Sequence, residues 1–94
     1  LLGDYYKPYS LERDAFIHLS LKEQVSKVAN SLYDKEPFLY ILNIDTNRLK
    51  YQDKLVFEDL YELNEDYPHY YGPLNTSSII KIERLEKRDD TFEY

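Results

Sequence analysis

Two histidines, His18 and His69, are the side chains of this sequence best suited to acid–base or hydrogen-bonding chemistry. A neutral imidazole offers one donor and one acceptor nitrogen, and histidine is the side chain that changes charge closest to neutral pH. His18 stands at the end of a predicted strand, two residues before Ser20. Ser20 and Glu23 have the S-x-x-E spacing of a helix capping box. We therefore expect His18 to lie beside a helix N-terminus, where free N–H groups attract an anion.

Two interpretations of each of these residues stay open. His18 either contacts a ligand or is a structural histidine bonded to the backbone. Ser20 is explained by N-capping alone, because a serine hydroxyl satisfies an orphan amide at that position. We expect capping to be the main role of Ser20, and His18 to carry the ligand contact.

The second histidine lies in a segment, residues 67–74, that we expect to be an ordered loop. Pro68 favours extended backbone before it, and Gly72-Pro73 stiffens the exit. A rigid loop holds its side chains still, as binding sites require. In the alternative interpretation, the rings and prolines of the segment plug the end of a sheet.

Tyrosine is unusually frequent, with 11 residues among 94, and Tyr70 and Tyr71 stand next to His69. A tyrosine ring has an apolar body and a polar tip, so the bland interpretation is a rim of half-buried rings around a small core. The sharper hypothesis is a ring-lined cleft that stacks a flat ligand. Glu58 is a single carboxylate on a predicted strand, and alone it indicates little.

Several kinds of site are excluded by composition. The chain has two glycines, too few for a Gly-rich phosphate loop of the P-loop or dinucleotide-binding kind. It has no cysteine, which removes disulfides and zinc–thiolate sites. No pair of histidines has metal-ligand spacing, so no metal is expected.

The charge and the hydropathy of the chain limit the kinds of binding partner that we expect. The net charge of −6 repels phosphate backbones, so non-specific nucleic-acid binding is not expected. No apolar run approaches the roughly 18 residues that span a bilayer, so we expect no membrane association. The absence of cysteine fits a cytoplasmic protein. The sequence does not specify an oligomeric state.

The elements that must position these residues form one predicted domain, residues 1–94. The sequence predicts a loop over 4–13, a strand over 15–20, a helix from Lys22 to about Tyr33, and strands over 38–44, 54–60 and 78–85. The apolar run 38–44 has the length of a buried central strand. Asp45 opens a turn or short helix. Alternation places Phe16, His18 and Ser20 on one face of their strand. One main helix packed on strands indicates an α+β fold.

The motifs together resemble a known family. Phe16-Ile17-His18-Leu19-Ser20 (F-I-H-x-S) and the segment 68–74 (P-H-x-Y-G-P-L), with Tyr6-Lys7-Pro8 and Phe57-Glu58, are similar to short bacterial proteins of domain-of-unknown-function family 952. The resemblance covers nearly the whole chain. It implies an ADP-ribosyltransferase-like fold, a split, mainly antiparallel β core with helices packed against it.

That resemblance also implies a ligand, with NAD as the substrate. Ile17-His18-Leu19-Ser20 is similar to the H-V-H-L-S motif of RNA 2′-phosphotransferases, which places His18 and Ser20 in a middle motif. A late glutamate is common in such enzymes, and Glu58 and Glu83 are the candidates. A first motif would lie upstream of Leu1, so we expect that the chain lacks an N-terminal strand and helix.

The function expected is therefore binding of a small nucleotide-like ligand, NAD or ADP-ribose, with transfer of ADP-ribose or cleavage of the nicotinamide bond. His18 is the expected catalytic residue. The expected ligand-binding residues are His18, Ser20, Glu58, His69, Tyr70 and Tyr71. The alternatives are a non-catalytic ligand-binding module and a protein-interaction module with a tyrosine-rich rim.

Overall fold

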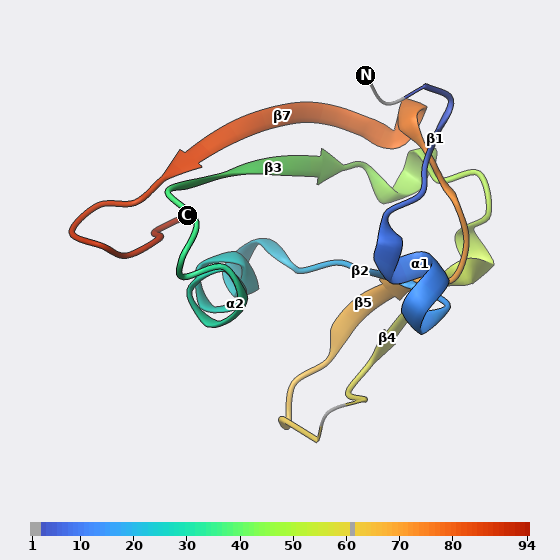
Figure 1. Ribbon diagram of the computed structural model, residues 1–94. Coiled ribbons are helices and arrows are strands. Elements are labelled where there is room, and N and C mark those ends of the chain that lie inside the picture. The colour runs from blue at the N-terminus through green and yellow to red at the C-terminus, as the bar shows by residue number, and fades with distance from the viewer. Residues whose placement is uncertain (1–2, 61) are drawn as a thin grey trace.

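The computed structural model describes residues 3–60 and 62–94. Its α-helices are α1 (Tyr9–Asp14) and α2 (Val25–Leu32), and its 3-10 helices are η1 (Lys22–Gln24), η2 (Thr46–Arg48), η3 (Gln52–Lys54) and η4 (Thr76–Ser78). Its strands are β1 (Tyr5–Tyr6), β2 (Ile17–His18), β3 (Phe38–Ile44), β4 (Leu55–Glu58), β5 (Tyr67–Tyr70), β6 (Leu74–Asn75) and β7 (Ile79–Glu86). Figure 1 shows β3 and β7 as a long arch, with α2 beneath it and the shorter strands β2, β5 and β4 to one side.

The named strands pair in three antiparallel sheets: β1 with β6, β3 with β7, and β2-β5-β4 with β5 in the centre. Because α2 is the main helix and the pairing is antiparallel, the predicted α+β class is confirmed. Among the described residues, no helix has both the length and the apolar character needed to cross a bilayer.

The two faces of the β2-β5-β4 sheet differ in chemistry. On one face Ile17 lies opposite Tyr70, and both are buried together with Leu49 and Leu74 in the apolar core. On the other face His18 lies opposite His69. Successive side chains on a strand point to opposite faces, so one strand pair supplies both core and polar residues.

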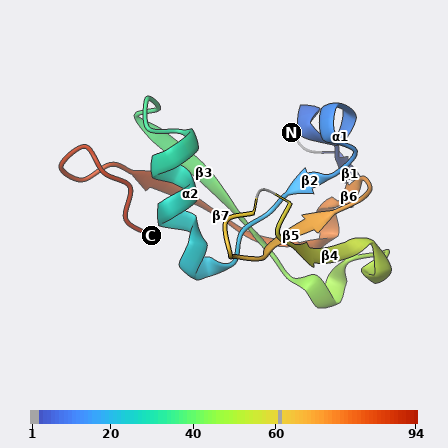
Figure 2. The ribbon, with the colours of Figure 1, turned by 90° about the horizontal axis from the view of Figure 1, so that it is seen from below.

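The β3–β7 ribbon corrects one prediction. Strand β3 covers the expected residues 38–44, but it pairs with β7 rather than lying at the centre of a larger sheet. Six of its seven side chains are half-buried, none is fully buried, and Tyr40 is 63% exposed. Periodicity alone did not reveal this, because a short apolar run does not specify how many strands flank it. The view from below shows α2 alongside the ribbon (Figure 2).

The expected loop over 4–13 is also wrong, since it contains β1 and α1. Pro8 precedes the first turn of α1 with φ −68°, an angle that already suits a helix start. Helix α1 ends at Ala15, which has the left-handed φ of 68°. A non-glycine residue in that region is uncommon, and here it turns the chain sharply into β2. The predicted strand 15–20 is therefore only Ile17–His18.

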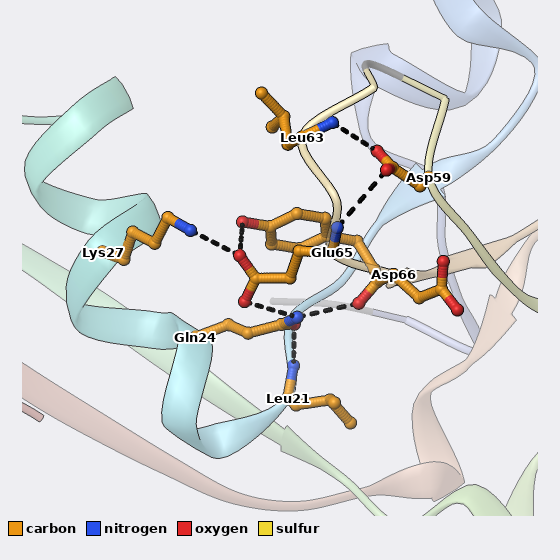
Figure 3. Close-up of polar contacts among 8 residues, drawn as sticks. Leu21, Gln24, Lys27, Asp59, Leu63, Glu65 and Asp66 are labelled. Atoms are coloured by element: carbon orange, nitrogen blue, oxygen red, sulfur yellow. Dashed lines mark hydrogen bonds and ion pairs between the residues drawn. The ribbon is translucent and has the colours of Figure 1, made fainter.

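The N-cap of the main helix was predicted one residue before its actual position. The helical segment begins with η1 and continues as α2, and its N-cap is Leu21 rather than Ser20. The side chain of Gln24, not Glu23, closes back onto the amide of Leu21 at 2.8 Å. Gln24 also donates to the carbonyl of Asp66 at 2.8 Å, so it fastens the helix start to the loop before β5 (Figure 3).

The segment 67–74, expected as a loop, begins with β5 and reaches the first residue of β6, and only residues 71–73 lie outside a strand. Proline usually argues against a central strand because it has no N–H to donate. Pro68 contributes through its carbonyl, which accepts a hydrogen bond from the amide of Leu19 at 3.0 Å. The predicted strands over 54–60 and 78–85 are present as Leu55–Glu58 and Ile79–Glu86. The expected short helix after Asp45 is η2, which the Asp45 side chain caps.

Candidate functional site

The two histidines of the chain lie side by side. The antiparallel register of β2 and β5 places His18 directly opposite His69, and their ring centroids are 5.5 Å apart, edge to face. His69 is buried at 2% exposure, whereas 36% of the His18 side chain is exposed. One ring is therefore fixed inside the molecule, and its neighbour faces solvent at the same spot.

Each histidine is held by its own carboxylate. Nε2 of His18 lies 2.9 Å from Oδ2 of Asp14, the last residue of α1. Arg13 donates to the same Asp14 oxygen at 2.6 Å. The hydrogen bond from Arg13, followed by the one from His18, lowers the pKa of Asp14 to about 2. Asp14 is therefore ionised at neutral pH, and it orients the exposed imidazole.

The second pair is built across β4 and β5. Nδ1 of His69 lies 2.8 Å from Oε1 of Glu58, and the hydroxyl of Tyr71 donates to the same oxygen. The bonds from Tyr71 and then His69 lower the pKa of Glu58. The Glu58 bond also raises the pKa of Tyr71. Glu58 is thus an anion with one oxygen engaged twice, and the imidazole of His69 has a fixed orientation.

Phe16 joins the two pairs. Its ring centroid lies 4.7 Å from that of His18, 4.3 Å from that of His69 and 5.1 Å from that of Tyr71. Phe16 is 6% exposed, so it forms an apolar floor under the cluster. We call Asp14, Phe16, His18, Glu58, His69 and Tyr71 the histidine cluster.

Two of these residues were not expected as site residues. Asp14 stands four positions before His18, and the sharp turn at Ala15, between the end of α1 and β2, brings the two side chains together. The sequence did not indicate this pair, because Asp14 stands between the predicted loop over 4–13 and the predicted strand over 15–20 that contains His18. Phe16 was expected on the His18 face by alternation, although not as the centre of the cluster.

One expected site residue, Tyr70, lies elsewhere, and Ser20 lacks the capping role expected of it. Tyr70 is fully buried on the core face, and its hydroxyl accepts a hydrogen bond from the amide of Tyr51 at 3.3 Å. Burial raises the pKa of Tyr70. Because side chains alternate along β5, Tyr71 rather than Tyr70 can face a ligand beside His69. Ser20 does not cap the helix, and His18 contacts the end of α1 rather than a helix N-terminus.

The histidine cluster does not have the ligands of a metal site, and it does not line either of two hollows found on the surface. In residues 3–60 and 62–94, no group of three or more histidine and carboxylate side chains is placed to hold a metal ion. Two hollows open near β1 instead, one lined by Tyr5, Arg48 and Lys50 and one by Tyr5 and Tyr51. Neither of these two hollows is lined by the histidines, beside which a ring-lined cleft was expected.

Comparison with known proteins places most of the chain in one family. Residues 2–82 match the family model described as Protein of unknown function (DUF952). No curated protein and no solved structure matches the chain significantly.

Proposed function

We propose, for a chain that belongs to the DUF952 family, that the histidine cluster binds a small nucleotide of the NAD or ADP-ribose class. The observation that carries the proposal is the juxtaposition of His18 and His69, each paired with its own carboxylate, with ring centroids 5.5 Å apart. The exposed, oriented imidazole of His18 can bond a ribose hydroxyl, and the buried ring of His69 supports it from within the molecule.

His18 is the contact residue of this proposal. It is the more exposed histidine, and Asp14 fixes its ring without burying it. Tyr71, which is half-buried and packs on Phe16 in the same cluster, supplies a flat ring against which a nicotinamide or adenine ring can pack. Tyr70 has no part in this contact, because it lies in the core.

Glu58 is the carboxylate suited to chemistry. Cleavage of the nicotinamide bond of NAD releases nicotinamide with the bonding electron pair and leaves positive charge on the ribose. A water molecule or an acceptor hydroxyl then attacks that carbon and gives its proton to solvent, so the products are neutral nicotinamide, the ADP-ribosyl product and a proton. An oriented carboxylate stabilises the developing positive charge. Glu58 lies in the cluster, whereas Glu83, the other candidate, pairs with Lys81 on β7.

The proposal extends to an ADP-ribosyltransferase-like fold. Antiparallel strands divided among separate sheets, with α2 alongside one of them, are compatible with that architecture. An experimental structure with bound ADP-ribose would test fold and site together. Ligand density away from His18 and Tyr71 would contradict the assignment of the site.

Isothermal titration with NAD, ADP-ribose and nicotinamide is the direct test of binding. We expect His18→Asn to weaken nucleotide binding at least about tenfold, the loss typical of one good hydrogen bond. Tyr40→Ser, at an exposed ring on β3, is the control and should bind as the parent does. If none of the three compounds gives a heat of binding, the proposal is wrong.

Catalysis needs its own measurement, release of nicotinamide from NAD. Glu58→Gln should lower the release rate while binding persists, and Glu83→Gln should change neither. The two side chains are a matched pair, 24% and 28% exposed and each on a strand. Equal loss in both variants would contradict a role for Glu58.

A non-catalytic binding module is the second candidate. It is favoured by the way His69, Glu58 and Tyr71 satisfy one another and by the position of the two hollows away from the cluster. This candidate predicts nucleotide binding that His18→Asn weakens, together with no nicotinamide release by the parent protein.

A further inference from the structure

We infer that the pocket beside β1 and β6 binds the phosphate group of a small, ring-bearing molecule, through Lys50, Arg48 and Ser77. This pocket has a volume of about 520 Å³, and it lies apart from the histidine cluster. The inference does not depend on nucleotide binding at the cluster, because none of the cluster residues lines the pocket.

Lys50 is the first anchor. Its Nζ donates to the hydroxyl of Tyr5 at 3.0 Å and lies 5.7 Å from the Tyr5 ring and 5.5 Å from the Tyr51 ring. The Tyr5 hydrogen bond is the main reason that the pKa of Lys50 is raised, so the ammonium stays charged. An ammonium has three donors, and the bond to Tyr5 uses one. Lys50 is therefore a positioned cation with donors to spare.

Arg48 is the second anchor. Its Nε lies 3.4 Å from the carboxylate of Asp45, which leaves the two terminal Nη groups as a fork. A guanidinium fork matches the oxygens of a phosphate group. Asp4 is the one carboxylate of the lining, and Asp45 offsets part of the charge of Arg48, so Lys50 contributes most of the attraction for an anion. In a chain of net charge −6, two cations at one pocket are a distinct local feature.

The backbone that carries both anchors is fixed by Asn75. Its Oδ1 accepts from the amide of Lys50 at 2.9 Å, and its Nδ2 donates to the carbonyl of Arg48 at 2.9 Å. Nδ2 also donates to the hydroxyl of Ser77 at 2.8 Å. These bonds fix the backbone at Arg48 and Lys50 and orient the Ser77 hydroxyl before a ligand arrives, which lowers the entropy cost of binding.

A second hollow indicates what the phosphate is attached to. It has a volume of about 290 Å³ and is lined by Tyr5, Tyr51, Pro73 and Lys7. Tyr5 lines both hollows. A molecule with phosphate on Lys50 and Arg48 can therefore lay a flat ring against Tyr51 and Pro73. Ring faces and proline favour stacking of an aromatic group.

The test is titration of the whole chain with inorganic phosphate and with phenyl phosphate, followed by amide NMR shifts and calorimetry. We expect shifts at the amides of Lys50 and Ser77 with both probes, and tighter binding of phenyl phosphate. Lys50→Met keeps the length of the stem over the rings but removes the charge. This substitution should weaken the binding of both probes at least about tenfold, because hydrogen bonds to a charged partner are the strongest.

Lys81→Met is the matched control, because it removes the same charge from an exposed position on β7. It should leave binding of both probes within about twofold, which separates a local site from a general charge effect. His18→Asn should also leave phosphate binding unchanged, so failure of the nucleotide proposal and failure of this one are distinguishable.

Equal weakening by Lys50→Met and Lys81→Met would overturn the inference, as would shifts confined to other residues. If Lys50→Met fails to fold, Ser77→Ala replaces it, since Ser77 is exposed. Unchanged phosphate binding by Ser77→Ala, together with no shift at Lys50 in the parent protein, would likewise contradict the site.

Discussion

The β2-β5-β4 sheet and the β3–β7 ribbon use their strands in opposite ways. The ribbon has the longest strands, seven and eight residues, yet Tyr40, Ile80 and Ile82 on it are 63%, 56% and 55% exposed. The sheet has strands of two to four residues, yet Tyr70 and His69 on it are 0% and 2% exposed. Strand length and burial are therefore separate properties in this molecule.

Their ion pairs differ in the same way. On β7, Lys81 pairs with Glu83 and Arg84 with Glu86, two residues apart on one exposed strand. Exposed pairs of this kind contribute little to stability. In the sheet, the His69–Glu58 pair joins two strands, and the imidazole is buried. The region with the shorter strands therefore holds its polar groups by tertiary contacts, as a binding site requires.

The largest expected effect is in the core below the histidines. Tyr70→Ala removes a fully buried ring and should destabilise the protein by about 3–5 kcal/mol. Tyr40→Ala, on the ribbon, should cost less than about 1 kcal/mol. Urea denaturation of the two variants measures both. Similar losses of stability in the two variants would contradict this difference, because they would mean that the two rings are equally well packed.

The next largest difference is expected between substitutions of the two histidines. His69→Ala removes a buried ring and leaves Glu58 without one of its two donors, so a loss of about 2–3 kcal/mol is expected. His18→Ala should cost less than about 1 kcal/mol, because its side chain is 36% exposed. Thermal melts compare them. A loss of several kcal/mol for His18→Ala would make it a core histidine and end its role as the contact residue.

The helix start gives a smaller effect. Gln24 is 3% exposed and bonds both Leu21 and Asp66, so Gln24→Ala should cost about 1–2 kcal/mol. Ser20→Ala should cost less than about 0.5 kcal/mol, because Ser20 is not the N-cap. Denaturant titrations decide between them. The reverse order would restore Ser20 as the cap.

Acid should act on the histidine cluster through its carboxylates. The pKa of Asp14 is lowered from 3.8 to about 2, chiefly by Arg13, and that of Glu58 is lowered from 4.5, chiefly by Tyr71. A lowered native pKa gives stability that is fully present above the unfolded value and is lost as pH falls through the native value. Stability should therefore fall from about pH 5 towards pH 2.

Urea midpoints measured at several pH values check this dependence. Asp14→Asn and Glu58→Gln should each flatten the acid limb, since the substituted side chain no longer titrates. Asp34→Asn, at an exposed position after α2, is the control and should keep the shape of the parent profile. Unchanged acid limbs in both site variants would show that the two pairs do not stabilise the fold.

The sequence by itself determined the features that depend on neighbouring residues. The run 38–44 gave the bounds of β3, and the apolar spacing after Lys22 located η1 and α2 within one or two residues. Alternation placed Phe16 and His18 on one face, because a strand repeats every two residues. The α+β class followed from the same local periods.

Only the tertiary structure decided the features that depend on partners distant in the chain. It paired β2 with β5, which set His18 against His69, and it turned Tyr70 inward and Tyr71 towards Glu58. Period-two alternation says that neighbours point to opposite faces, but not which face the core covers. For the same reason β3 is half-buried rather than central, because burial is decided by what packs on a strand and not by the strand itself.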